Sequence, residues 1–391
     1  MRRLLFAGVP AMGALLLWTM MPAAAQEQKS APPPAKPAAK AWAPKRLADG
    51  HPDLQGTYDI ATITPLERPK GAPQAYTAEE AHRREAAFVK EKEEADAPIA
   101  GDRTAPKKGG GESLAPKGST SGPNAGWWLV ATGAGGAVGG YNTGWLDVGS
   151  NFTIVDGQAR SSLVIDPPDG RVPRALPAAQ KRAAAEYGRP TSDAGESTDR
   201  DLETTAGAYD DPERRPLGER CLLGFGSTSG PPALPDYFYN NLHQIVQTPD
   251  SVMILTEMVH DARIVRMNAE HLPKNIRQWM GDSVGHWEGD TLVVDTTNFT
   301  DKTRFHGSTE NLHVVERFQR TGEHTLLYRF IVEDPSTWEH SWTGEMTWPE
   351  TQSHIYEYAC HEGNYALPDI LKGARVREKE AAEAKAAGKG N

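Results

Sequence analysis

The chain lacks most of the residue clusters that mark the commoner kinds of functional site. Only two cysteines occur among 391 residues, so at most one intrachain disulfide is possible. Lys and Arg form no cluster, and the formal charge is −10. This acidic balance argues against nucleic acid and anionic lipid as partners. After residue 21 no apolar run is long enough to span a membrane, so no span is expected in the mature chain.

Residues 1–25 have the pattern of a secretory signal peptide. Two arginines precede the apolar run 4–21, and Ala23-x-Ala25 supplies the small residues of a cleavage site before Gln26. The alternative is an uncleaved membrane anchor, although glycine and proline at positions 8, 10 and 13 interrupt the run. Cleavage near Ala25 removes two arginines and no acid, which takes the charge from −10 to −12. We therefore expect a periplasmic or secreted protein.

Composition divides the rest of the chain into four regions. Residues 26–46 are rich in Pro, Ala and Lys and predict a stiff tether. Residues 47–240 predict an irregular region with short strands and helices, residues 241–372 an antiparallel β-barrel, and residues 373–391 a charged C-terminal helix or tail. Thr77-Ala-Glu-Glu80 matches a capping box, so a surface helix is expected from there to about Glu94.

The second half of the chain predicts a mainly β fold. Between residues 243 and 360, roughly eight or nine segments of alternating polar and apolar residues follow one another at hairpin spacing. The alternation places Trp338, Trp342 and Trp348 on one face. A meander of this length tends to curl, and we expect a closed or nearly closed barrel. The strands have no helices between them, which argues against a parallel α/β fold.

Three phrases of the sequence resemble a widespread family of secreted bacterial proteins. They are "SLVIDPPDGR" at 162–171, "GHWEGDTLVVDTTNF" at 285–299 and "YEYACHEGNY" at 356–365. The resemblance extends over residues 49–375 and implies secretion, but no reaction, cofactor or catalytic residue. The phrase Gly285–Leu292 is also similar to a strand pair of lipocalin-type barrels, a likeness of fold alone.

The two cysteines are Cys221 and Cys360, and the second is followed by His361 and Glu362. Haem attachment requires C-x-x-C-H and a zincin helix requires H-E-x-x-H, and the phrase "ACHEGNY" has neither spacing. In an oxidising compartment the two cysteines are expected to form a disulfide, which would join the loop before the barrel to its last strand. The alternative is a nucleophilic Cys360 thiolate beside His361.

The phrase "EMVHDARI" holds the candidates for catalysis. At the barrel mouth, His260 and Asp261 would serve as a base and its orienting group, with Glu257 and His361 as further members. The alternative is a polar hairpin whose His-Asp pair caps its own turn. A metal site would require His243 to converge with His260 and a carboxylate. We expect no metal and no other cofactor.

Charged and aromatic residues supply the candidates for ligand binding. Either Glu316 or Arg317 must share a face with apolar Val314, where a charge is costly unless paired. A buried ion pair, with Arg329 or Glu345 as a possible partner, and a ligand-orienting group inside a cavity are equal alternatives. Aromatic rings interleaved with amides suit sugar or phenolic ligands, or a well-bonded turn. The remaining candidates are His243, Asn241, Trp342 and Tyr141.

Three functions from different classes follow from these features. The first is a β-barrel protein that binds a small, partly apolar molecule in its cavity, with its oligomeric state left open. The second is a lyase, isomerase or hydrolase that acts on such a molecule, and the third is a structural envelope protein. A cavity where His260, Glu257 and His361 converge would favour the enzyme. A cavity without titratable groups would favour the binding protein. A barrel filled by Trp338, Trp342 and Trp348 would argue against both the binding protein and the enzyme.

Overall fold

The computed structural model describes residues 42–96, 147–181, 209–224, 229–235 and 239–388. All elements named below belong to one unit, Ala43–Asn391. The expected signal peptide, most of the tether and Tyr141 lie outside the described residues. Within the described part of the chain, no helix has the length and apolar character needed to cross a membrane.

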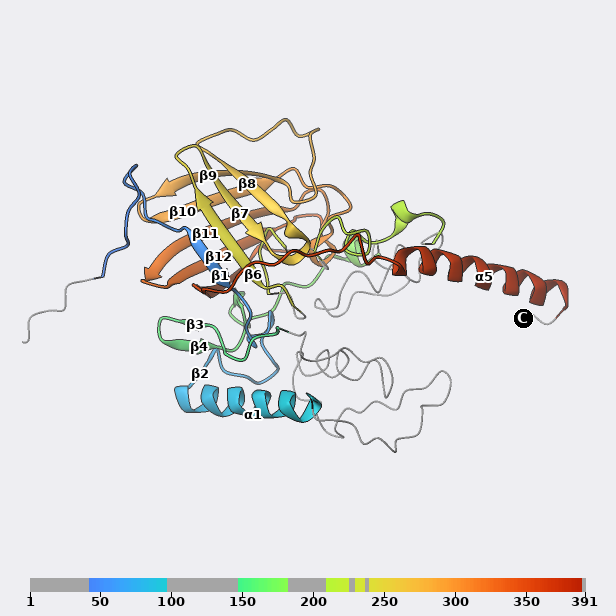
Figure 1. Ribbon diagram of the computed structural model, residues 1–391, viewed down its shortest axis with the longest axis horizontal. Coiled ribbons are helices and arrows are strands. Elements are labelled where there is room, and N and C mark those ends of the chain that lie inside the picture. The colour runs from blue at the N-terminus through green and yellow to red at the C-terminus, as the bar shows by residue number, and fades with distance from the viewer. Residues whose placement is uncertain (1–41, 97–146, 182–208, 225–228, 236–238, 389–391) are drawn as a thin grey trace, which may run out of the picture. The chain divides into compact units, whose positions relative to one another are not determined.

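Ten strands form one curved sheet, which is shown in Figure 1. Every ladder in it is antiparallel except the one between β8 and β9, which is parallel. The expectation of a mainly antiparallel β fold is therefore confirmed. In spatial order the strands are β1 (Gly56–Asp59), β6 (Leu242–Gln247), β7 (Ser251–Thr256), β8 (Ala262–Met267), β9 (Asp282–Glu288), β10 (Thr291–Thr297), β11 (His313–Gly322), β12 (Thr325–Glu333), β13 (Trp342–Pro349) and β5 (Val164–Asp166).

The alternating sequence of the strands gives the sheet one apolar face. In β12, which reads TLLYRFIVE, the even-numbered residues from Leu326 to Val332 are buried and the odd-numbered ones are partly exposed. In β11 the same alternation buries Val314, Glu316 and Phe318. Successive side chains of a strand point to opposite faces, so all of these residues lie on the inner, concave face.

The sheet is an open half-barrel, and the expectation of a closed or nearly closed barrel is wrong. To close the barrel, β1 would have to pair with the free edge of β13. That edge is occupied by β5, which pairs with β13 at Gly344–Val164 and Thr343–Asp166. An isolated bridge between Tyr58 and Glu350 connects β1 with the end of β13, but no ladder between these strands is formed in the described residues. The closed lipocalin-type barrel is therefore absent.

The parallel pairing of β8 and β9 interrupts the expected meander. Parallel neighbours cannot be joined by a tight hairpin, because the chain must return to the same end of the sheet. The return is made by the connection 268–281, which has no strand or helix of its own. It closes against the sheet through the bridge between Gln278 and Phe299. The connection forms one wall of the site described below.

Aromatic side chains fill the concave face of the half-barrel. Trp342 and Trp348 are fully buried, and Trp338 is 3% exposed. Their rings pack against neighbouring rings, for example Trp348 on Tyr328 at 4.8 Å between centroids. Aromatic rings bury a large apolar area, so this cluster supplies much of the free energy that holds the sheet curved. The other fully buried aromatic residues of the cluster are Tyr58, Tyr328, Phe299, Phe305, Phe318 and Phe330.

A second, small sheet contacts the long N-terminal helix. It consists of β2 (Ala75–Tyr76), β4 (Gln158–Arg160) and β3 (Ile154–Val155), and the helix is α1 (Ala78–Asp96). The hydroxyl of Thr77 accepts the backbone N–H of Glu80 at 3.2 Å, as the capping box predicts. Figure 1 shows α1 beside these strands, and Tyr76, Ala81, Phe152 and Ala159 form the apolar cluster between them.

The C-terminal part differs from its prediction in one respect. Residues 351–365, which include "HIYEYAC", form no strand, because β5 already occupies the free edge of β13. Helix α5 (Ala366–Ala386) begins earlier than the expected helical tail at 373. The disulfide between Cys221 and Cys360 is confirmed, with 5.7 Å between the Cα atoms. It joins the loop before β6 to the segment that follows the last strand.

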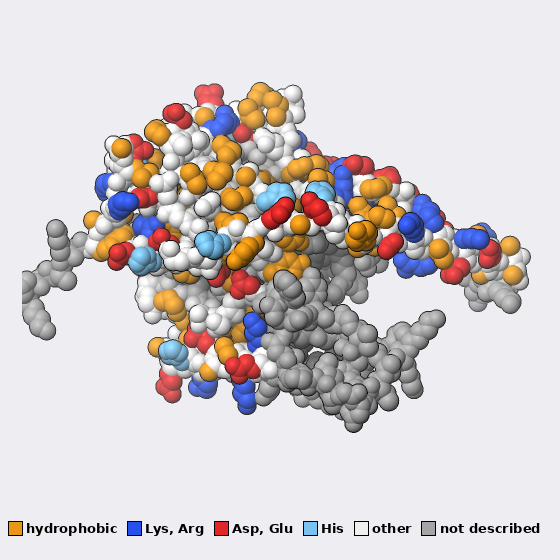
Figure 2. Space-filling model, in the orientation of Figure 1, with side chains coloured by type: hydrophobic (Ala, Val, Ile, Leu, Met, Phe, Trp, Pro, Cys, Tyr) orange, Lys and Arg blue, Asp and Glu red, His pale blue; other side chains and the backbone are white. Residues whose placement is uncertain are grey.

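Three short 3₁₀ turns also lie in the described part of the chain: η3 (Pro212–Arg214), η5 (Met258–His260) and η6 (Phe305–Gly307). The face of the molecule in Figure 2 carries acidic and basic side chains in alternation, and the basic ones form no continuous stripe on it. This distribution agrees with the absence of a Lys/Arg cluster in the sequence.

Candidate functional site

The interior of the half-barrel is packed rather than open around its tryptophans. The indole of Trp348 contacts the imidazole of His243, with 4.9 Å between the ring centroids. His243 is 1% exposed, and burial lowers the pKa of its imidazole to about 4. A neutral, enclosed imidazole among aromatic rings serves as a core residue. By the criterion derived from the sequence, this packing counts against both a binding protein and an enzyme that hold their ligand inside the barrel.

A pocket of about 750 Å³ lies instead at one end of β8 and β9. One wall is β8 itself, the second is the connection 268–281, and the third is the loop that follows Cys221. We name this the β8 pocket. Its apolar lining consists of Leu222, Leu223, Ile264, Leu272 and Met280, and its polar or aromatic lining includes Asp261, Arg263, Arg266, Arg277, Trp279 and Asp282.

Two of the three arginines in this lining are neutralised by carboxylates. The Arg263 guanidinium is buried and donates to both carboxylate oxygens of Glu316, with 2.9 Å from Nη2 to Oε1. The Arg266 guanidinium donates to both carboxylate oxygens of Asp282 at 2.9 and 3.1 Å. Burial alone would raise the pKa of Asp282, but the hydrogen bonds from the Leu272 N–H, His271 and Arg266 outweigh it and hold that pKa below its usual value.

Arg277 differs from the other two because its bonds are to neutral groups. Its Nη1 donates to the backbone carbonyls of Phe299 and Glu310 at 2.9 and 2.8 Å. These two bonds fix the position of the guanidinium at the rim of the β8 pocket. No carboxylate contacts it among the described residues, so its charge stays available.

Asp261 is the one acidic residue of the described lining that forms no ion pair with an arginine. Burial raises the pKa of its carboxyl to about 6, and the hydrogen bonds from the Ser229 side chain and from the Gly224 N–H, the latter at 3.3 Å from Oδ2, oppose this only in part. A carboxyl group with this pKa exchanges its proton close to neutral pH. Perturbed carboxyl groups of this kind in a cleft are frequent at functional sites.

The backbone immediately before Asp261 is strained. Val259 and His260 both have left-handed backbone angles, with φ of 58° and 47°. A β-branched residue rarely adopts this conformation, and such strain is concentrated at functional sites in proteins. The turn η5 separates three neighbouring candidates. Asp261 lines the β8 pocket, whereas His260 is exposed. Glu257 is buried, and its carboxylate accepts a hydrogen bond from the Tyr356 N–H at 2.9 Å.

The other predicted site residues lie apart from one another. Asn241 donates to the Asp147 carbonyl at 2.7 Å, and Trp342 belongs to the aromatic core. Glu316 faces inward and pairs with Arg263, whereas Arg317 faces outward and pairs with Glu288. His361 is exposed next to the disulfide. The described residues contain no group of three or more His, Cys, Asp or Glu that could hold a metal ion.

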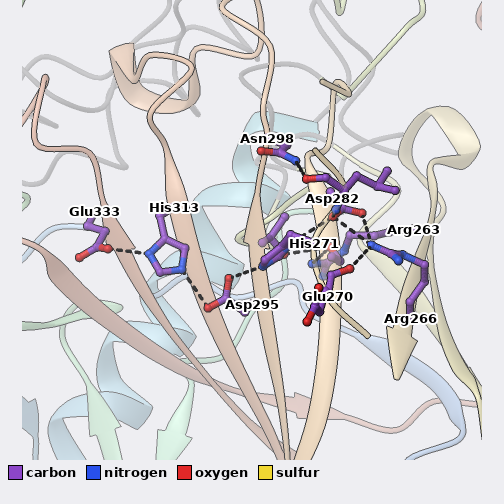
Figure 3. A network of polar contacts seen from close by, with 12 residues as sticks. Arg263, Arg266, Glu270, His271, Asp282, Asp295, Asn298, His313 and Glu333 are labelled. Carbon is purple, nitrogen blue, oxygen red and sulfur yellow. Dashed lines mark hydrogen bonds and ion pairs between the residues drawn. The ribbon is translucent and has the colours of Figure 1, made fainter. Parts of the chain in front are cut away.

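A chain of alternating histidines and carboxylates crosses the outer face of the sheet and ends at the β8 pocket (Figure 3). His313 lies between Glu333 and Asp295, at 2.5 and 3.0 Å from their oxygens. His271 lies between Asp295 and Asp282, at 3.0 Å from each. Because His271 belongs to the connection 268–281, the chain fastens one wall of the pocket to the sheet.

No motif in the sequence predicted this chain of residues. Asp295, His313 and Glu333 occupy outward positions of three adjacent strands, and correct strand register would have placed them side by side. His271 belongs to an irregular connection, so no periodic signal predicts its position.

A second pocket, of about 440 Å³, is lined by residues of α1, β1 and the segment 147–153. It contains Asp59, whose pKa burial raises to about 6, and Asp147, whose pKa burial also raises. It has less space and fewer apolar side chains than the β8 pocket.

No family model matches the chain, and no curated protein is significantly similar to it.

Proposed function

We propose that the protein binds a small, partly apolar molecule, and that the binding site is the β8 pocket rather than the interior of the half-barrel. The observation that carries this proposal is the composition of the pocket wall: aliphatic side chains on three sides surround a few fixed polar groups. Ligand pockets in proteins have this composition and lie in the same range of volumes. The tryptophan-filled interior supports the same location.

A location outside the cytoplasm forms part of the proposal. The disulfide between Cys221 and Cys360 supports it, because disulfides persist in oxidising compartments. The signal-peptide pattern of residues 1–25 supports it independently. Both observations fit a binding protein of the periplasm or the extracellular medium.

Binding accounts for the wall of the β8 pocket better than catalysis does. The alternative, an enzyme, is favoured by one observation, the raised pKa of Asp261 beside a strained turn. A general acid or base works best when its pKa lies near the operating pH. Asp282, the other carboxylate in the described lining, is held ionised by Arg266 and His271. Its proton is therefore unavailable at neutral pH.

A fluorescent probe tests the proposal. N-phenyl-1-naphthylamine is neutral and apolar, and its fluorescence rises when it enters an apolar site. We expect saturable binding to the purified protein. Ile264, a β8 residue in the pocket wall, is 53% exposed, and Ile264→Ser should weaken probe binding by roughly five- to tenfold through the loss of apolar contact.

The matched control is Val246→Ser. Val246 is also an exposed aliphatic residue of a strand, 37% exposed on β6, and it is not part of the pocket lining. This variant should bind the probe as the wild type does. Absence of saturable binding to the wild type would refute the proposal, and equal weakening in both variants would place the probe elsewhere on the protein.

A further inference from the structure

The β8 pocket contains one arginine that no carboxylate of the described chain contacts. Its described lining contains three arginines and two aspartates. Arg263 is neutralised by Glu316 and Arg266 by Asp282, which leaves Arg277 and Asp261 as the remaining charges. Arg277, which bonds only to backbone carbonyls, is therefore the arginine of the described lining whose guanidinium has no carboxylate partner.

Arg277 is also oriented in a way that suits an anion. Both of its hydrogen bonds to protein use Nη1, and both acceptors are backbone carbonyls. In the described part of the chain, Nε and Nη2 have no hydrogen-bond partner, and these two nitrogens form one edge of the planar group. A guanidinium edge with two parallel N–H groups matches the two oxygens of a carboxylate or a sulfonate. Fixing the group beforehand reduces the entropy lost on binding.

Apolar side chains lie close to this cation in the same pocket. Trp279 follows Arg277 by two residues and lines the pocket, as do Met280 and Leu272 on the same connection. The Trp279 backbone is fixed by the Thr303 hydroxyl, which donates to its carbonyl at 2.6 Å. An anionic group at Arg277 would therefore leave the rest of a ligand against indole and aliphatic surface.

We propose that the ligand class of the β8 pocket is a small organic anion, a carboxylate or sulfonate attached to an apolar body, and that Arg277 binds the anionic group. This inference rests on the proposed binding function of the pocket. Beyond that function, it specifies that the ligand carries a negative charge and that Arg277 selects for this charge.

A pair of probes with related ring systems isolates the charge. 8-Anilinonaphthalene-1-sulfonate carries a sulfonate, and N-phenyl-1-naphthylamine does not. Arg277→Gln should weaken binding of the sulfonate probe by about tenfold, the contribution of one charged hydrogen-bonding pair, and leave the neutral probe unchanged. Arg277→Lys keeps the charge without the planar fork and should lose only part of that affinity.

The control for net charge is Arg171→Gln, which removes one positive charge from an exposed pair with Glu67. It should leave both probes unaffected, because Arg171 is not in the pocket lining. Circular dichroism of each variant at the assay pH confirms that it is folded. Should Arg277→Gln not fold, sodium chloride added to the wild type provides the second measurement. Salt should weaken the sulfonate probe and spare the neutral one.

The outcomes separate this inference from the function on which it rests. If the neutral probe binds and Arg277→Gln leaves the sulfonate probe unchanged, the anion inference is wrong and the binding function stands. If Arg277→Gln weakens both probes equally, Arg277 merely supports the wall, and the inference is again wrong. If neither probe binds the wild type, the binding function and the inference both fail.

Discussion

Arg263 on β8 and Glu316 on β11 form a two-point ion pair on the concave face of the sheet, where their side chains are 5% and 0% exposed. The Tyr328 hydroxyl donates to the same carboxylate at 2.8 Å, and the Arg263 guanidinium also contacts Ser283. Every strong charge in this cluster therefore has a partner. A buried pair of this kind contributes little net stability, but the loss of one member leaves a charge without a partner.

Glu316→Gln should therefore be among the most damaging conservative substitutions in this chain. The amide has nearly the shape of the carboxylate but leaves the buried Arg263 charge uncompensated. We expect the free energy of unfolding to fall by about 3–5 kcal/mol, as measured by urea unfolding at pH 7.

The matched control is Glu288→Gln, which removes the partner of Arg317 on the outer, exposed face. Exposed ion pairs are screened by water, so little change is expected there. The double variant Arg263→Met/Glu316→Leu should recover most of the lost stability, because no unpaired charge remains. Equal effects of the two Glu→Gln variants would contradict the assignment.

A second prediction concerns His313, whose imidazole lies between two carboxylates. Its hydrogen bond with Asp295, together with that to Glu333, raises the pKa of His313 to about 9 against the opposing effect of burial. A raised pKa means that the folded state binds the proton more tightly than the unfolded chain does, whose histidines titrate near ~6.5. The stabilisation is thus complete below that pH and is lost as the pH rises through about 9.

His313→Gln should accordingly lower the free energy of unfolding at pH 6 and have almost no effect at pH 10. Because Glu333 is 50% exposed, solvent screening reduces the loss, and we expect about 1–2 kcal/mol. Urea unfolding curves at several pH values measure the difference. His286→Gln, at a half-exposed histidine with a single carboxylate neighbour, is the control and should show a smaller pH-dependent change. A loss that does not vary with pH would indicate packing rather than charge.

A third prediction concerns the disulfide. It closes a loop with a sequence separation of 139, and in the chain-entropy model such a loop restricts the unfolded state by roughly 4–5 kcal/mol. Cys221→Ser/Cys360→Ser should lose about this much stability. Leu222 and Leu223 directly follow Cys221 and line the β8 pocket, so the variant should also bind N-phenyl-1-naphthylamine more weakly. Unfolding with and without a reductant should reproduce the difference in the wild type and show none in the variant.

The strands were predictable because their burial follows the two-residue period of the sequence. β12 is the clearest case, since its buried residues alternate without interruption from Leu326 to Val332. The same reasoning failed for residues 354–360, where alternation is present but the adjoining edge of β13 is already paired with β5. Edge occupancy depends on β5, which comes from far upstream in the chain and has only three residues. Such long-range competition leaves no local signal.

The candidate site was predicted only in part, for a related reason. Asp261 was identified because it is an acid beside a histidine, and the structure places it in the β8 pocket. The left-handed backbone of Val259 and His260 points the side chains of Glu257 and His260 away from the pocket. Residue spacing on a regular strand does not predict such a turn. Arg277 and His271 lie in the connection 268–281, where position depends on contacts with the sheet rather than on periodicity.

The last prediction follows from the raised pKa of Asp261. In the folded protein burial raises this pKa to about 6, above the ordinary value of 3.8. The stability associated with its proton is therefore present below that ordinary value and is lost as the pH rises through about 6. Asp261→Asn, which cannot ionise, should be more stable than the wild type at pH 8, and the difference should shrink towards pH 4.

The same proton should control the binding of an anion. Between pH 8 and pH 5 Asp261 loses its negative charge while the sulfonate of 8-anilinonaphthalene-1-sulfonate stays ionised, so the affinity of the wild type should rise by roughly three- to fivefold, with a midpoint near about 6. Asp261→Asn should bind the probe tightly across the whole range, because repulsion is absent at every pH. The neutral probe should show no such midpoint with either protein. Far- and near-ultraviolet circular dichroism at each pH separates this effect from the probe binding of an acid-expanded state. A wild-type affinity that stays constant from pH 8 to pH 5 would show that Asp261 does not face the bound anion.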